Sequence, residues 1–203
     1  MQVHDPGADR PVGRRPVSSP QAIEKAAFAL FDRNGFEATT VDDIAHAAGI
    51  GRRTFFRYFA SKNDVVWGDW QGALIRMRRQ LAAAPVGAPL AEVLRDAVVG
   101  YNRIEPSQVS QHRRRMELVL HVPALQAHST LRYAEWRDVV ADFVATRTDQ
   151  RSTDLLPQLT AHAALGAAVT AYEQWLRDAG GDADDLAALL HECLTRLAEW
   201  GRA

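Results

Sequence analysis

Residues 39–62, TTVDDIAHAAGIGRRTFFRYFASK, are typical of two short helices joined by a tight turn. Thr40 is a favourable N-cap for the first helix, and Asp43, three residues later, can complete a capping box. Gly49 can adopt the left-handed backbone conformation that ends a helix. Between these signals, apolar residues recur at helical spacing and form one stripe: Val41, Ile44, Ala45 and Ala48. The stretch therefore predicts a compact helical hairpin.

The second helix of this hairpin presents a cationic and aromatic face. Phe55 and Phe59 are four residues apart, so they share the face that packs back on the first helix. This arrangement turns four other side chains outward: Arg52, Arg53, Phe56 and Arg57. A short, rigid helix with such a face suits the major groove of DNA. The alternative interpretation is a solvated basic face on an ordinary helical hairpin.

The wider segment, residues 20–66, resembles the DNA-binding domain of the TetR family of bacterial transcriptional regulators. The matching run is AFALFDRNGFEATTVDDIAHAAGIGRRTFFRYFASKNDVV. The resemblance implies an all-α protein, with an N-terminal helix-turn-helix domain of three helices and a C-terminal helical domain for ligand binding and dimerisation. The chain departs from the common family pattern at four positions, which bear on the operator sequence rather than the architecture: Gly51, Arg53, Phe56 and Tyr58.

The residues that we predict to contact DNA lie in three segments of the chain. Residues 1–17 are rich in Pro, Gly and charge and predict a disordered basic arm, whose arginines can enter a narrow minor groove. The alternative is a tail that only aids solubility. Lys62 lies in the first turn of the following helix, where a helix N-terminus can meet a phosphate. The full predicted set is Arg14, Arg15, Thr40, Arg52, Arg53, Thr54, Phe56, Tyr58 and Lys62.

Composition sets limits on the class of protein. A chain of 203 residues can form one large core or two modest domains. Its formal net charge of −1 excludes a general polyanion binder, so any contact with nucleic acid must come from a local patch. The single cysteine, Cys193, excludes an internal disulfide framework and fits a reducing compartment. With no apolar signal segment and no bilayer-length apolar run, the sequence predicts a cytoplasmic protein.

The spacing of apolar residues predicts about nine helices and no β-strand. One of them is expected to run from Lys62 through Leu81, so that it joins an N-terminal domain, residues 18–63, to the remaining residues 64–203. Five further helices are expected at residues 90–105, 108–121, 124–146, 155–177 and 183–200.

No constellation of catalytic residues is visible. The seven histidines are scattered, and there is no HExxH, nucleophile-elbow or Walker-type motif. Glu117 and His121, four apart on a helix, can bind a metal, but an ordinary surface or core pair is favoured because the motif lacks further ligands. We therefore predict a protein that is not an enzyme and that holds no cofactor or metal.

The C-terminal helices carry a rich set of aromatic and sulfur-containing side chains. Ligand pockets are mostly apolar, so this set can line one; the alternative is plain core. The predicted lining residues are Trp67, Trp70, Met77, Tyr101, Met116, Leu120, Trp136, Phe143 and Tyr172. The family resemblance implies a hydrophobic small-molecule effector, and the similarity of residues 112–145 to actinobacterial members favours a long-chain acyl-CoA. Arg113, Arg114 and Arg115 can anchor its anionic group, the alternative being a solvated face.

A homodimer is expected on physical grounds. One recognition helix contacts few bases, and each good contact gives about 1–3 kcal/mol of discrimination. Two copies related by a two-fold axis double the number of bases contacted and suit a palindromic double-stranded DNA operator. The predicted dimer residues lie on the last two helices: Leu159, Ala163, Gly166, Val169, Thr170, Leu186, Leu190, Cys193, Leu194 and Leu197. The alternative is that these helices pack only within one chain.

The functional hypothesis is a dimeric repressor that an effector releases from its operator. The effector can act only through its different affinities for the two conformations of the protein. A ligand-independent architectural DNA-binding protein is the alternative.

Overall fold

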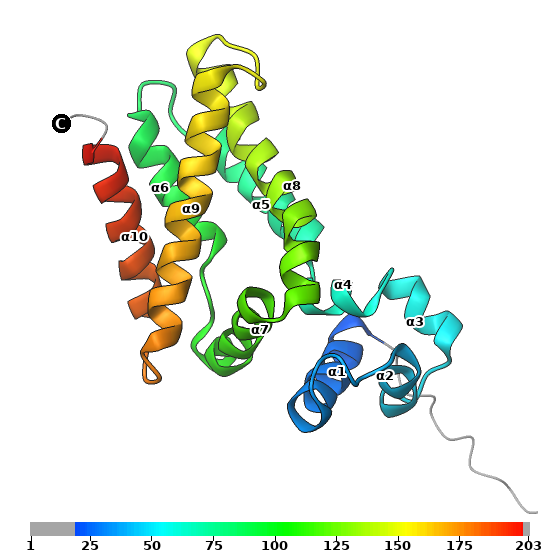
Figure 1. Ribbon diagram of the computed structural model, residues 1–203. Helices are drawn as coiled ribbons and strands as arrows, with labels where there is room; N and C mark the ends of the chain where they lie inside the picture. The colour runs from blue at the N-terminus through cyan, green and yellow to red at the C-terminus, as the bar shows by residue number, and fades with distance from the viewer. Residues whose placement is uncertain (1–18, 201–203) are drawn as a thin grey trace, which may run out of the picture. The chain divides into compact units, whose positions relative to one another are not determined.

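The computed structural model describes residues 19–200, so the predicted arm and its Arg14 and Arg15 lie outside the described residues. Within this range the chain forms ten α-helices and one short 3-10 helix and contains no β-strand, which confirms the all-α prediction (Figure 1). The elements are α1 (Pro20–Asn34), α2 (Val41–Ala47), α3 (Arg52–Tyr58), α4 (Lys62–Trp67), α5 (Trp70–Ala82), α6 (Leu90–Tyr101), η1 (Pro106–Gln108), α7 (Val109–His121), α8 (Pro123–Thr148), α9 (Leu155–Arg177) and α10 (Ala183–Trp200).

The chain divides into two compact units between Lys62 and Asn63. The N-terminal unit contains α1, α2 and α3, and the C-terminal unit contains the helices from α5 onward. The division falls at the start of α4, whose first residue belongs to the N-terminal unit and whose other residues belong to the C-terminal unit.

Local sequence signals explain the helix boundaries of the N-terminal unit. The Ser19 side chain caps α1 by accepting the Ala22 N–H, and Gly35 follows the helix with a φ of 83°. Thr40 and Asp43 form the predicted capping box of α2. Gly49 has a φ of 66°, the left-handed conformation expected at this turn. The unit is held together by apolar side chains with no exposed surface: Ile23, Ala27, Phe31, Ile44 and Phe55.

The C-terminal unit is a bundle built around α9. Helix α9 packs against α8 and α10, α10 also packs against α6, and α5 packs against α6 and α8 (Figure 1). One apolar core fills the space between these helices and includes four fully buried large side chains, Leu74, Trp175, Leu186 and Leu190. No helix among residues 19–200 is long and apolar enough to cross a membrane.

The predicted helix from Lys62 through Leu81 is in fact two helices. Gly68 has a φ of 58°, a left-handed conformation that ends α4. The Asp69 carboxylate then caps α5 by accepting the Gly72 N–H at 3.2 Å. This break, called the elbow below, accounts for ten α-helices where about nine were predicted.

Candidate functional site

The exposed face of α3 is the candidate nucleic-acid interface. Phe55 is fully buried and Phe59 is 6% exposed, so this face of α3 is fixed against the core of the N-terminal unit. The opposite face carries Arg52, Arg53, Phe56 and Arg57, all exposed. Phe56 is 44% exposed, which is unusual for a large apolar side chain in a small helical unit. The predicted outward residues therefore share one accessible surface.

The three arginines of this surface differ in their partners. Arg52 forms a 2.7 Å ion pair with Asp42 of α2, and its guanidinium lies 5.4 Å from the centre of the Phe56 ring. Arg57 donates a hydrogen bond of 3.1 Å to the Tyr58 hydroxyl and stacks over that ring. Arg53 has no hydrogen-bond or ion-pair partner among residues 19–200, and Thr54 beside it is half-buried. Among the described residues, the guanidinium of Arg53 therefore makes no bond inside the chain.

Thr40 serves mainly to cap α2. Its hydroxyl accepts the Asp43 N–H at 3.1 Å and donates its only proton to the Asp43 carboxylate at 2.6 Å. The bond from the Thr40 hydroxyl, followed by the bond from the Thr40 main-chain N–H, lowers the pKa of Asp43 below its ordinary value. In this arrangement the hydroxyl proton is directed to the Asp43 carboxylate. A contact of Thr40 with DNA stays a prediction.

Lys62 is likewise engaged inside the N-terminal unit. Its ammonium donates to the main-chain oxygens of Phe36 at 2.7 Å and Thr39 at 2.8 Å, and more weakly to that of Glu37 at 3.4 Å. It also lies 4.3 Å from the centre of the Phe36 ring. Partial burial lowers the pKa of Lys62 below its ordinary value. All three N–H donors point to the segment between α1 and α2. A contact of Lys62 with a DNA phosphate stays a prediction.

The nine predicted effector residues all belong to the core of the C-terminal unit or pack against it. Four are buried: Trp70, Met77, Trp136 and Tyr172. Five are partly buried: Trp67, Tyr101, Met116, Leu120 and Phe143. Four of the aromatic members form a continuous series of ring contacts. The ring centres are 5.0 Å apart for Trp67 and Trp70, 6.2 Å for Trp70 and Tyr101, and 6.4 Å for Tyr101 and Trp136. Their role in binding an effector stays a prediction.

A hollow on the C-terminal unit lies apart from the nine predicted effector residues. Its volume is about 610 Å³, and it lies between the connection from α6 to α7 and the turn from α9 to α10. Its walls mix charged and apolar residues, including Arg103, Ile104, Glu105 and Asp184, and include none of the nine predicted effector residues.

A buried polar group that the sequence did not reveal lies within the aromatic core. The Tyr172 hydroxyl donates to the Asn102 side-chain oxygen at 2.9 Å and lies 2.9 Å from Nε2 of His112. Because the tyrosine has only one proton to donate, Nε2 of His112 must carry a proton and Nδ1 must be an acceptor. Burial, together with the nearby Arg115, lowers the pKa of His112 to about 4. His112 is therefore neutral at physiological pH.

Two arginines of the run on α7 are engaged with main-chain oxygens of other helices. Arg113 stacks over Trp175 and donates to four main-chain oxygens around the end of α9: those of Trp175, Leu176, Asp178 and Gly181. Arg115 donates to the main-chain oxygen of Val66 in α4. Arg114 pairs with Glu117 at 3.3 Å. Arg113 and Arg115 thus connect α7 to the end of α9 and to α4, whereas the contact of Arg114 lies within α7. A role of the run in anchoring an anionic ligand stays a prediction.

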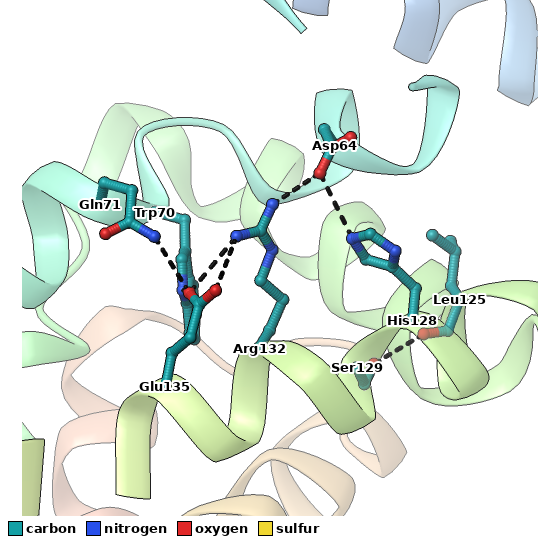
Figure 2. Close-up of polar contacts among 8 residues, drawn as sticks. All are labelled: Asp64, Trp70, Gln71, Leu125, His128, Ser129, Arg132 and Glu135. Carbon is teal, nitrogen blue, oxygen red and sulfur yellow. Dashed lines mark hydrogen bonds and ion pairs between the residues drawn. The ribbon is translucent and has the colours of Figure 1, made fainter. Parts of the chain in front are cut away.

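A network of charged and polar side chains connects α4, α5 and α8 (Figure 2). The Asp64 carboxylate on α4 accepts a hydrogen bond of 2.5 Å from Arg132 and lies 3.3 Å from Nε2 of His128, both on α8. Arg132 also contacts Glu135 at 3.3 Å. The Asp64, His128 and Arg132 side chains are only 15%, 20% and 18% exposed.

Glu135 extends this network to the first turn of α5. Its carboxylate accepts hydrogen bonds from Trp70 Nε1 at 2.6 Å and from Gln71 Nε2 at 3.0 Å (Figure 2). We call Asp64, His128, Arg132 and Glu135 the charge network. Sequence reasoning missed it, although three of its members recur at helical spacing on α8.

The predicted dimer residues fall into two groups. On α9, Leu159 is 60% exposed, Gly166 and Thr170 are exposed, and Ala163 and Val169 are half-buried. Leu155 and Leu156, which the prediction omitted, add 83% and 43% exposed leucines at the start of the same helix. This end of α9 leaves apolar surface open to a partner.

On α10 the prediction needs correction. Leu186 and Leu190 are fully buried and Leu194 is 7% exposed, all within the core of their own chain. The reason is that the apolar stripe of α10 packs against α9 and α6. Cys193 and Leu197 remain partly exposed.

Comparison with known proteins agrees with this geometry. Residues 23–66 match the family of bacterial regulatory proteins called the tetR family, and residues 88–200 match the MftR C-terminal domain. The chain is 46% identical over 167 residues to a protein of Mycobacterium tuberculosis described as a mycofactocin biosynthesis transcriptional regulator, MftR; the match covers 82% of this chain and 84% of the relative. The chain belongs to the TetR family. It is thus a DNA-binding transcriptional regulator, and its relatives agree with the prediction of a protein that is not an enzyme.

Solved structures of other transcriptional regulators share the fold. FadR of Bacillus subtilis, solved in complex with stearoyl-CoA, is 18% identical with a TM-score of 0.62, and the match covers 88% of this chain and 97% of that one. FadR of Thermus thermophilus, solved in complex with lauroyl-CoA, is 24% identical with a TM-score of 0.56 and coverages of 89% and 94%. At these identities the likeness concerns the fold alone.

Proposed function

We propose that this TetR-family protein is a homodimeric repressor that binds a palindromic operator and is released from it by a hydrophobic or acyl-CoA-type effector. The observation that carries the proposal is the exposed face of α3. On that face Arg53 has no partner among the described residues and Phe56 exposes an aromatic ring.

The partners of each side chain on the exposed face of α3 suggest which residues contact bases and which contact phosphates. The free guanidinium of Arg53 can make two parallel hydrogen bonds to a guanine, the commonest specific contact in the major groove. The exposed ring of Phe56 can contact a thymine methyl group. Asp42 holds Arg52 and Tyr58 holds Arg57. We expect these two arginines to contact phosphates rather than base edges.

The exposed leucines of α9 support the proposed dimer. Leu155 and Leu159 each leave more than half of their surface exposed, and Leu156 lies between them. Burying such side chains between two copies yields about 25 cal/mol for each Å² of apolar surface removed from water. A dimer through α9 would unite two copies of the DNA-binding unit in one assembly, and a palindromic operator requires two copies.

The effector class is argued from two observations. The aromatic series from Trp67 to Trp136 and the buried pair of His112 and Tyr172 give the C-terminal unit an apolar interior with a few fixed polar groups. Pockets for amphipathic ligands have this composition. Two solved relatives with the same fold carry lauroyl-CoA and stearoyl-CoA, so a long-chain acyl-CoA is the first effector to test.

The test is a binding titration with the full-length protein. A labelled DNA fragment from beside its own gene should bind with a dissociation constant at least about a thousandfold lower than that of a scrambled fragment. Stearoyl-CoA should then release the protein from the operator, and coenzyme A alone should not. Equal affinity for both fragments with no response to acyl-CoA would instead identify a ligand-independent architectural DNA-binding protein.

A further inference from the structure

Arg132 lies between two carboxylates that hold the two sides of the elbow. One η nitrogen donates to Asp64 on α4, and the other contacts Glu135, which in turn binds Trp70 and Gln71 at the start of α5 (Figure 2). The Arg132 guanidinium thus contacts α4 directly and is connected to α5 through Glu135.

The elbow makes these side-chain contacts necessary. Gly68, with a φ of 58°, interrupts the helix, so main-chain hydrogen bonding does not carry the direction of α4 into α5. The direction of α4 must be set by contacts from its neighbours. Polar contacts to α4 come from Arg132 and His128 on α8 and from Arg115 on α7, which donates to the main-chain oxygen of Val66.

Burial makes the pair of Asp64 and Arg132 a discrete contact. Their side chains are 15% and 18% exposed, so a separated pair would leave two poorly solvated charges. Removing one partner of a buried ion pair is strongly destabilising for this reason. The pair is therefore expected to be either formed or replaced by a rearranged α4 in which Asp64 reaches water, with few intermediate states.

The network also touches the predicted effector region. Trp70 donates its ring N–H to Glu135, and Trp136 follows Glu135 directly on α8. A ligand that displaced either ring would disturb the Glu135 carboxylate and hence Arg132. At the other end, α4 begins at Lys62, whose ammonium is bonded to the main-chain oxygens of Phe36 and Thr39.

We propose that Arg132 is the positioning residue that couples the effector-binding core to α4 and thereby to the DNA-binding unit. The coupling rests on the proposed function, whereas the placement of α4 by Arg132 does not. With the pair formed, α4 is held in the direction that permits operator binding. When an effector shifts Trp70 or Trp136, the pair opens and α4 is released.

Hydrogen exchange of the full-length protein tests the placement of α4. Arg132→Met removes both contacts while keeping a long apolar side chain, and amides of residues 62–72 are expected to exchange on the order of tenfold faster than in the wild type. Arg132→Lys keeps the charge but not the planar fork, so it should restore part of the protection. Arg76→Met is the matched control, because it removes an exposed arginine–carboxylate pair with Asp69 at the same elbow and should leave exchange unchanged.

Unchanged exchange over residues 62–72 in Arg132→Met would overturn the proposal. Operator titrations with and without stearoyl-CoA then test the coupling. If stearoyl-CoA weakens operator binding by the wild type, the coupling can be measured as the ratio of the operator dissociation constants with and without stearoyl-CoA. Arg132→Met should bind stearoyl-CoA with nearly unchanged affinity, but its ratio should be close to one. A wild-type ratio in this variant would overturn the coupling. A wild type that ignores stearoyl-CoA would count against the proposed effector, and the exchange result would still decide on the placement of α4.

Discussion

The Lys62 ammonium lies 2.8 Å from the main-chain oxygen of Thr39. The first side chain of α4 is thus hydrogen-bonded to the segment between α1 and α2. Hydrogen bonds to a charged group contribute about 1.5–3 kcal/mol each. We therefore predict that Lys62→Met destabilises the N-terminal unit by about 2 kcal/mol. Native-state hydrogen exchange of buried α1 and α2 amides should then be roughly thirtyfold faster. Lys25→Met, on the exposed face of α1, is the control and should change little. An unaltered exchange rate with a lower salt dependence of DNA binding would instead assign Lys62 to a phosphate.

Arg53→Ala should weaken operator binding and relax its specificity at one base pair in each half-site. The loss expected for a bidentate contact to guanine is about 1–3 kcal/mol per site, because the side chain has no competing partner among the described residues. Fluorescence anisotropy with operators carrying single base-pair changes measures both effects. Arg33→Ala, an exposed arginine at the end of α1, should leave the operator preference intact. If Arg53→Ala retained wild-type affinity and preference, Arg53 would have no role in reading bases.

If the protein is a dimer through α9 as proposed, Leu159→Glu should make it a monomer at micromolar concentration. A carboxylate in place of a leucine that is 60% exposed costs the free chain little, but it would be buried without a partner in the interface. Leu131→Glu on α8 is a closely matched control, since Leu131 is 66% exposed and lies outside the proposed interface. Sedimentation velocity distinguishes the two species. Dimers of unchanged stability in Leu159→Glu would place the interface elsewhere.

His112 predicts a specific loss of stability in mild acid. Its folded-state pKa of about 4 lies below the ordinary value of 6.5, so the unfolded chain binds this proton first as the pH falls. The free energy of unfolding should therefore decrease between about pH 6.5 and pH 4, by about 2 kcal/mol from pH 7 to pH 5 for this group alone. His112→Gln, which can still donate to Tyr172, should remove that part of the pH dependence in urea denaturation curves. An identical pH dependence in both proteins would contradict the assignment.

Local signals predicted the N-terminal unit well because each is decided within a few residues. The capping box at Thr40 and Asp43, the positive φ of Gly49 and the outward face of α3 all follow from short-range sterics and hydrogen bonding. The roles of Thr40 and Lys62 could not be read in the same way. Each depends on which nearby oxygens already take up its donors, and for Lys62 those oxygens are more than twenty residues away in sequence.

In the C-terminal unit, the spacing of apolar residues did not predict which surface covers a helix or where a helix breaks. The apolar stripe of α10 correctly indicated a buried face, but a stripe does not say whether its own chain or a partner covers it, and Leu186 and Leu190 proved to be core. The elbow was missed because Trp67, Trp70, Leu74 and Met77 keep helical spacing on both sides of Gly68. Pairs such as Asp64 with Arg132 are distant in sequence, and no local pattern links them.

Footprinting on the DNA beside the protein's own gene is the most direct test of the central claim that two copies of α3 read one duplex. Two protected segments related by two-fold symmetry are expected, with centres about 10 base pairs or a multiple apart, and Arg53→Ala should give much weaker protection. Continuous or randomly placed protection that is the same for the wild type and Arg53→Ala would contradict it.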